Sequence, residues 1–170
     1  MMEKHISPET LVRPVIRDIG KQWMLVGAVR PDGTYNAMTA SWGGIGFLWG
    51  KPVAFVFVRP GRYTHEFTEA SDRVTLSFLP EEYRAAMQLF GKKSGRDTDK
   101  FAEGGLHARV RDGYLTVEEA ERILCGRKLY RDVIRPEGAL PGANFLSVYA
   151  AKDYHTMYVY EITDVILRQD

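Results

Sequence analysis

The chain has 170 residues, 23 lysines and arginines against 22 aspartates and glutamates, a net charge of +1, and 45% hydrophobic residues. This length and apolar content fit one globular domain that buries roughly two-thirds of its unfolded surface, which excludes a disordered chain. The balanced charge argues against general nucleic-acid binding, and the longest apolar run, the six residues Val53–Val58, is too short to cross a membrane.

The first predicted element is a β-hairpin. Trp23–Arg30 is mostly apolar and ends at Pro31-Asp32-Gly33, where Gly33 can supply the positive φ of a tight turn. Tyr35–Trp42 follows as the returning strand.

Two further strands are predicted from their side-chain patterns. Val53–Val58 is β-branched or aromatic almost throughout and is bracketed by Pro52 and Pro60, so we expect a strand buried on both faces. Arg73–Phe78 alternates polar with apolar residues and predicts a strand buried on one face.

Two helices are predicted between and after these strands. The first covers Thr64–Ala70, with Thr64 as its N-cap. The second covers Pro80–Phe90, where Tyr83, Ala86, Met87 and Phe90 recur at helical spacing, and we expect Gly91 to end it.

The C-terminal part is less uniform. Residues 116–133 fit a helix or a strand, whereas His155–Leu167 is rich in tyrosine, valine and isoleucine and predicts a strand. Many strands with few helices in a chain of this length indicate a mainly β protein with helical appendages, built on a β-barrel. No linker or repeat divides the sequence, so we expect a single domain over residues 1–170.

Positive charge is concentrated in two segments of this nearly neutral chain. Arg59–Thr64 leads into the first predicted helix, and the free N–H groups at a helix start favour a phosphate. Lys92–Lys100 follows the second helix. A single shared anion would explain both segments if the fold brings them together, whereas a surface turn and a solvated loop are the alternatives.

The end of the hairpin, Asn36–Gly46, combines small and hydroxyl side chains with Trp42. Its backbone amides could face a flat polar heterocycle, with the indole as an apolar wall. Core packing followed by a flexible glycine loop is the alternative. Gly43-Gly44-Ile45-Gly46 lacks the glycine spacing of a dinucleotide fingerprint, so we expect no Rossmann site.

Other catalytic patterns are weak. Cys125 is the only cysteine, which favours a buried small apolar residue and a reducing, cytoplasmic setting. The four histidines lack the spacing of metal ligands, so we expect no metal site; they are His5, His65, His107 and His155.

Four segments, in this order along the chain, resemble the flavin reductase-like, flavoredoxin-type family of FMN-binding split barrels: Asn36–Trp42, Val58–Thr64, Lys93–Phe101 and Asp153–Tyr158. The resemblance implies an FMN-binding split β-barrel that forms a homodimer. It implies FMN as cofactor and NAD(P)H as co-substrate.

The resemblance also assigns residues. The isoalloxazine ring and ribityl chain would be lined by Thr39, Ala40, Ser41 and Trp42. The phosphate would be held or neighboured by Arg59, Arg62, Tyr63, Thr64, Lys93 and Ser94. His155 would stand near the flavin on the nicotinamide side, as the candidate catalytic residue. Tyr160 departs from the family pattern, which has a small residue there, and could narrow access for the nicotinamide.

Because flavin accepts hydride without a protein nucleophile, the weak catalytic patterns are compatible with an oxidoreductase. We therefore expect an oxidoreductase of flavin reductase type that passes electrons from NAD(P)H to flavin or to an acceptor protein. A non-enzymatic FMN-binding electron carrier is the alternative, favoured if Tyr160 closes the nicotinamide site. A β-barrel interaction protein without flavin is the third hypothesis.

Overall fold

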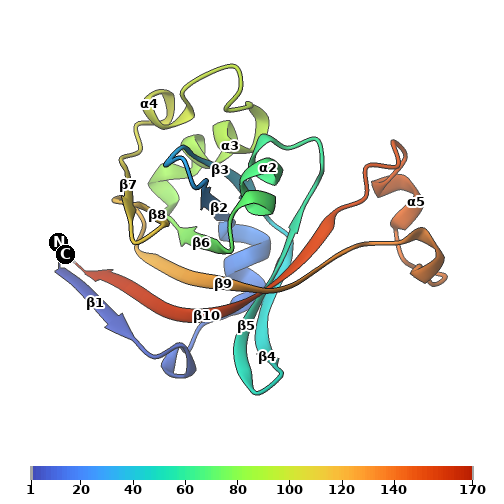
Figure 1. The fold of residues 1–170 in the computed structure, drawn as a ribbon, viewed down its shortest axis with the longest axis horizontal. Helices are drawn as coiled ribbons and strands as arrows, with labels where there is room; N and C mark the ends of the chain where they lie inside the picture. The colour runs from blue at the N-terminus through green and yellow to red at the C-terminus, as the bar shows by residue number, and fades with distance from the viewer. Residues whose placement is uncertain (1, 170) are drawn as a thin grey trace.

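The computed structural model describes residues 2–169, and most of its regular structure is one antiparallel sheet (Figure 1). The strands of this sheet are β1 (Met2–Ile6), β2 (Met24–Val29), β3 (Tyr35–Ala40), β4 (Gly43–Leu48), β5 (Lys51–Val58), β6 (Arg73–Phe78), β9 (Arg122–Val133) and β10 (Thr156–Gln169). A separate hairpin consists of β7 (Ala108–Arg111) and β8 (Tyr114–Val117). The predicted mainly β fold class is confirmed.

The strand order explains why the sheet curls into a split barrel. It runs β3-β2-β6-β9-β10-β5-β4, so β3 and β4 lie at opposite ends. Only Ser41 and Trp42 separate these two strands in the chain. Three Cα steps of 3.8 Å span at most about 11 Å, so the two ends of the sheet must meet there. The described residues form no β3–β4 ladder, and the barrel remains open at this seam.

The curled sheet has a core on each face. Its inner face encloses a cluster contributed by β2, β3, β5, β6, β9 and β10, whose largest side chains are Met24, Phe78, Tyr158 and Tyr160. The outer face packs a second cluster against two helices and the β7–β8 hairpin, including Leu25, Phe90, Phe101, Leu115 and Ile123. Residues adjacent along a strand, such as Leu25 and Val26, therefore belong to different cores.

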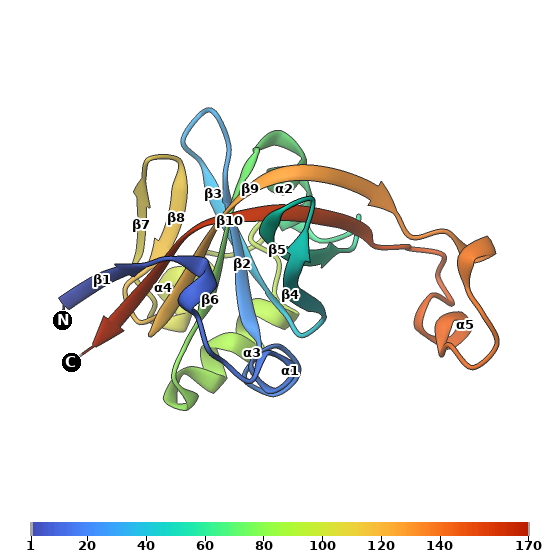
Figure 2. The same ribbon diagram turned by 90° about the horizontal axis from the view of Figure 1, so that it is seen from below.

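The helices are short and peripheral. They are η1 (Pro8–Thr10), α1 (Val15–Arg17), η2 (Asp18–Gln22), α2 (Tyr63–Ala70), η3 (Glu81–Tyr83), α3 (Arg84–Lys92), α4 (Lys100–Gly104), η4 (Pro136–Gly138) and α5 (Phe145–Val148). α2, α3 and α4 gather on one side of the barrel, whereas α5 lies on an arm that extends away from it (Figures 1 and 2). No helix of the described residues is long and apolar enough to cross a membrane.

The predicted hairpin is confirmed, with Met24 paired to Ala40 and Val29 to Tyr35. The predicted burial of the next two strands is wrong in both cases. β5 buries alternate residues and leaves Phe55 and Phe57 partly exposed, because it lies next to the edge strand β4.

β6 is buried from Val74 to Phe78 because the β7–β8 hairpin covers its polar face. There the Thr75 hydroxyl donates to the carbonyl of Leu115. The ambiguous stretch 116–133 belongs to strands β8 and β9, joined by residues 118–121. The predicted C-terminal strand is confirmed as β10.

The two predicted helices form with different ends. Arg62, not Thr64, is the N-cap of α2, and Thr64 is buried within the first turn. α3 continues past Gly91 to Lys92, and a 3₁₀ turn replaces the predicted start of this helix.

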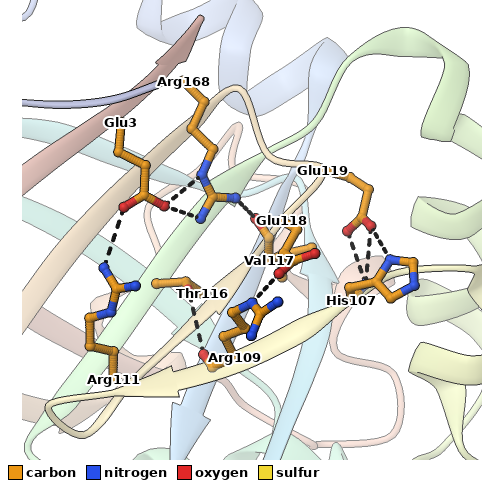
Figure 3. A network of polar contacts seen from close by, with 9 residues as sticks. All are labelled: Glu3, His107, Arg109, Arg111, Thr116, Val117, Glu118, Glu119 and Arg168. Carbon is orange, nitrogen blue, oxygen red and sulfur yellow. Dashed lines mark hydrogen bonds and ion pairs between the residues drawn. The ribbon is translucent and has the colours of Figure 1, made fainter. Parts of the chain in front are cut away.

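A polar network ties the β7–β8 hairpin to the two terminal strands (Figure 3). Arg168 of β10 donates to Glu3 of β1 at 2.7 Å and to the carbonyl of Val117. Arg111 of β7 reaches the other oxygen of Glu3 at 3.4 Å. These contacts fix the hairpin to the two ends of the chain.

Candidate functional site

A first cavity of about 210 Å³ lies at the seam of the barrel. It is lined by Met38, Thr39, Ala40, Ser41, Trp42, Phe57, Arg59, Arg62 and His155. Trp42, 47% exposed, and the half-buried Phe57 supply aromatic surface. The Thr39 hydroxyl donates to the carbonyl of Met87 at 2.5 Å, so α3 holds β3 in place beside the cavity. The site therefore depends on the open seam between β3 and β4.

A second cavity of about 180 Å³ adjoins the first, because Met38 and Arg62 line both. Its lining is Asn36, Met38, Gly61, Arg62, Tyr63, Thr64, Lys92, Lys93, Ser94, Gly95 and Lys100. These residues include four cationic side chains and no carboxylate. The fold thus brings the two positively charged segments of the sequence together, and the second cavity favours an anion.

Arg62 is the cation at the junction of the two cavities. Its guanidinium donates to the carbonyls of Gly91 and Phe90, at 2.6 and 2.9 Å, in the last turn of α3. The negative end of the helix dipole thereby holds the cation in place without a carboxylate. Burial lowers the pKa of Arg62, but a guanidinium remains charged at any physiological pH.

Lys100 is the most deeply buried of these cations, with a side chain that leaves the residue 3% exposed. Its ammonium donates to the carbonyl of Ala37 and lies 4.9 Å from the ring centre of Phe90. Burial, and secondly the charge of Arg62, lower the pKa of Lys100 to about 8. A buried cation without a counter-ion is costly, and an incoming anion would relieve that cost.

The floor of the second cavity depends on close packing. Asn36 donates from its amide to the Thr64 hydroxyl at 2.9 Å, and both residues are buried. A Cβ atom at Gly95 would lie 2.3 Å from Oδ1 of Asn36, which is closer than any real contact. Glycine at position 95 therefore allows the loop after α3 to approach β3 and close the cavity.

The other predicted phosphate residues lie nearer the surface. Lys93 lines the cavity and forms an ion pair with Glu103 at 2.6 Å. The Ser94 hydroxyl accepts a hydrogen bond from the amide of Arg96 at 3.2 Å. Tyr63 lines the cavity with its ring 4.6 Å from the guanidinium of Arg96.

Arg59 shares the first cavity with Arg62 and, unlike the other predicted phosphate residues, does not line the second. Its guanidinium pairs with Asp153 and donates to the carbonyl of Val148 at 3.1 Å. Arg59 therefore connects the end of β5 to the arm that carries α5.

His155 lines the first cavity and lies in the chain just before β10. It is 7% exposed, and its ring centre lies 5.1 Å from that of Trp42. Burial and the nearby charge of Arg59 lower the pKa of His155 to about 4. The imidazole is therefore neutral at physiological pH. Tyr160 lines neither cavity; it is fully buried in the inner core.

Phe57, Asn36 and Lys100 line the cavities but were not assigned to the cofactor individually from the sequence; Lys100 counted only as part of the basic segment Lys92–Lys100. Asn36 and Lys100 lie within the segments that drew attention, but a polar strand residue and a loop lysine give no sign of burial. Phe57 was expected to be a core residue, because its strand was predicted to be buried on both faces, so its place in the cavity was missed.

A larger hollow of about 660 Å³ lies elsewhere, next to α1 and η2. Four of its charged residues form ion pairs with one another: Arg13 contacts Asp18 at 3.1 Å, and Arg84 contacts Glu81 at 3.1 Å. Among the residues from 2 to 169, no group of three or more histidine, cysteine, aspartate or glutamate side chains could hold a metal. We therefore place the candidate site at the two adjoining cavities.

Fold and site together define a split-barrel protein with a partly aromatic cavity that adjoins a cavity lined by four cationic side chains. The family model described as flavin reductase like domain matches residues 16–170, and the chain belongs to this family. The predicted family is therefore confirmed.

Solved structures share the fold. Flavoredoxin of Desulfovibrio vulgaris (Miyazaki F) is similar with a TM-score of 0.68 and 24% identity, covering 94% of this chain and 73% of that chain. The FMN-binding domain of a flavin reductases-like enzyme from Shewanella baltica OS155 is similar with a TM-score of 0.69 and 15% identity, covering 98% of this chain and 77% of that chain. The FMN-binding protein from Thermus thermophilus with bound p-hydroxybenzaldehyde is similar with a TM-score of 0.62 and 22% identity, covering 84% of this chain and 70% of that chain. A search of the curated proteins found no significant match.

The residues of the two cavities fit FMN. This cofactor joins a flat ring system to a phosphate, and the cavities offer aromatic walls at one end and four cations without a carboxylate at the other. The buried Lys100, which pairs with no acid among residues 2–169, is the specific observation in favour of the phosphate.

Proposed function

We propose that residues 1–170 form a single FMN-binding domain that acts as an oxidoreductase of flavin reductase type. It would take electrons from NAD(P)H and pass them to flavin or to an acceptor protein. The observation that carries the proposal is the union of the aromatic cavity with the acid-free cationic cavity through Met38 and Arg62. The family membership and the names of the structural relatives support the same cofactor.

Different residues would bind different parts of the cofactor. Arg62, Lys93 and Lys100 would hold the phosphate, with the start of α2 and Ser94 beside it. Thr39, Ala40, Ser41 and Trp42 would line the ring and the ribityl chain.

When bound, FMN would supply the redox chemistry by accepting a hydride and passing the electrons on. His155 and Arg59 would remain at the wall of the ring cavity as the polar groups nearest to a second substrate.

A non-enzymatic electron carrier is the second candidate, because the Desulfovibrio relative is named a flavoredoxin. The sequence favoured this candidate only if Tyr160 closed the nicotinamide site. Tyr160 lines neither cavity, which supports the enzyme over the carrier.

We also propose a homodimer. The edge strand β4 and the residue after it expose Phe47 and Trp49, which are 67% and 60% exposed, and Trp42, just before the strand, is 47% exposed. Apolar side chains on an open sheet edge are typical of an interface. A monomer by light scattering at micromolar concentration would contradict this proposal.

Cofactor binding is tested by titrating the colourless protein with FMN and with riboflavin, which lacks the phosphate. We expect FMN to bind at least tenfold more tightly, since one charge-assisted hydrogen bond contributes about 1.5–3 kcal/mol. Equal affinity for the two flavins would place the phosphate outside the second cavity, and no binding of either would refute the flavin site.

Electron donation is tested by mixing the FMN-loaded protein anaerobically with NADH and with NADPH. Loss of the visible absorbance of the flavin with either donor supports the reductase. If neither donor reduces the flavin and dithionite does, the carrier replaces the enzyme as the conclusion.

A further inference from the structure

The arm between β9 and β10, residues 134–155, bears on the site although most of it extends away from the barrel (Figures 1 and 2). It carries a cluster of three aromatic rings, with Phe145 and Tyr149 at 4.7 Å and Tyr149 and Tyr154 at 5.3 Å between ring centres. The arm returns to the barrel at His155, where it forms a wall of the first cavity.

Tyr149 makes the one hydrogen bond that the His155 ring receives from the described residues. Its hydroxyl lies 2.7 Å from Nδ1 of His155, and the two residues are 8% and 7% exposed. If Nδ1 donated this bond, the hydroxyl hydrogen of Tyr149 would need another acceptor, and none lies within bonding distance among residues 2–169. The arrangement in which the hydroxyl donates and Nδ1 accepts satisfies both groups with this one bond. A neutral imidazole that accepts at Nδ1 carries its hydrogen on Nε2.

Arg59 keeps Tyr149 in this position. The guanidinium lies 5.3 Å from the centre of the Tyr149 ring and donates to the carbonyl of the preceding residue, Val148, at 3.1 Å. It also pairs with Asp153, two residues before His155. Both ends of the segment from Val148 to Asp153 are thus tied to one side chain at the end of β5.

The protonation of both partners agrees with this geometry. Burial raises the pKa of the Tyr149 phenol, so it keeps the hydrogen that it donates. Burial, and then the charge of Arg59, lower the pKa of His155 to about 4, so the ring stays neutral.

We infer that Tyr149 is a positioning residue, which fixes His155 as the tautomer that presents an Nε2–H donor to the first cavity. The class of ligand atom that this donor suits is an uncharged acceptor, such as a carbonyl oxygen or an unprotonated ring nitrogen of a heteroaromatic ligand. That ligand would be the flavin or its nicotinamide substrate, so this part of the inference rests on the proposed function. The tautomer itself does not.

The test is nitrogen-15 NMR of histidine side chains in the protein without added flavin. In the wild type we expect one His155 tautomer, with hydrogen on Nε2. Tyr149→Phe keeps the ring and removes the hydroxyl, so both tautomers should appear. Tyr154→Phe is the matched control, because it removes a hydroxyl from the same aromatic cluster, and it should leave the His155 signals unchanged.

A second variant guards against local misfolding of Tyr149→Phe. Arg59→Met keeps the Tyr149 hydroxyl but removes its anchor, and it should broaden or mix the same signals. A wild-type ring with hydrogen on Nδ1, or a wild-type tautomer that persists in Tyr149→Phe, would overturn the inference.

Adding FMN separates this inference from the proposed function. If the wild type binds FMN, the Nε2 signal of His155 should shift, and Tyr149→Phe should lower kcat/KM for nicotinamide-driven reduction by about tenfold with little change in FMN affinity, as expected for one hydrogen bond. If FMN does not bind, the proposed function fails while the tautomer result stands. If FMN binds and Tyr149→Phe keeps the wild-type tautomer, only the role of Tyr149 fails.

Discussion

Replacing Lys100 by methionine should stabilise the protein and weaken its hold on FMN. The pKa of this buried lysine falls from 10.5 to about 8 in the folded state. At about 1.4 kcal/mol per pH unit, this difference corresponds to about 3 kcal/mol of destabilisation by the charged side chain. Methionine also removes the hydrogen bond to Ala37, which contributes about 1 kcal/mol. The net expectation at pH 7 is a gain of about 2 kcal/mol in the free energy of unfolding.

The sign can be checked through pH. The folded pKa lies below the unfolded one, so the unfolded chain binds more protons between about pH 8 and 10.5. Wild-type stability therefore gains from Lys100 deprotonation as pH rises through this window, and Lys100→Met lacks that gain. Urea unfolding of both proteins at about pH 7 and pH 9.5 measures the difference. The reasoning is refuted if the variant is less stable at pH 7, or if its advantage does not shrink at the higher pH.

The functional cost is measured in the same variant. Lys100→Met should weaken FMN by about tenfold or more and leave riboflavin affinity nearly unchanged, because only FMN carries the phosphate. Lys128→Met is a matched control: Lys128 is partly buried, donates to the carbonyl of Thr68 and, like Lys100, has a pKa lowered by burial, but it lines neither cavity. Its removal should leave FMN binding unchanged.

Three further predictions concern other parts of the fold. Tyr160→Phe should raise the free energy of unfolding by about 1–2 kcal/mol in urea titrations and leave FMN binding unchanged, because the buried Tyr160 hydroxyl has no partner among residues 2–169; a loss of stability would show that it is satisfied. Gly95→Ala should lower the free energy of unfolding by about 1–2 kcal/mol and weaken the binding of FMN, because the new Cβ atom would displace Asn36. Unchanged FMN affinity would contradict the close packing of this loop. Glu119 raises the pKa of His107, mainly by a hydrogen bond, so the His107 contribution to stability is present below about pH 6.5 and lost as pH rises through the raised pKa. Glu119→Gln should return that pKa toward its ordinary value by NMR titration, and an unmoved titration would refute the pairing.

The strand pattern of the sequence was informative because side-chain alternation reports one strand at a time. It identified the first hairpin, β5, β6 and β10. It could not report what covers a face. The polar Thr75 predicts that this face of β6 is exposed, but in the structure Leu115 of the β7–β8 hairpin covers it. Phe57 is read as core until the neighbouring edge strand leaves it at a cavity.

The site was partly visible for a similar reason. Segments rich in charged or small residues can be recognised in the sequence. The fold places Thr39–Trp42, Arg62–Thr64 and Lys93–Ser94 around two adjoining cavities. Burial of Lys100 and the bond from Tyr149 to His155 are tertiary events, however, with no periodic signal in the chain. For Arg59 the phosphate contact stays a prediction, and its contacts with Val148 and Asp153 of the arm could not be read from its charge.

The open seam between β3 and β4 makes the size of the binding site a matter of loop length. Ser41 and Trp42 alone bridge the two ends of the sheet, whereas the inner core packs against the other strands. A residue inserted or deleted at this bridge would widen or narrow the cleft and leave the buried side chains in place. Natural variation and protein engineering could therefore alter the accepted ligand at this one short connection, without repacking the barrel.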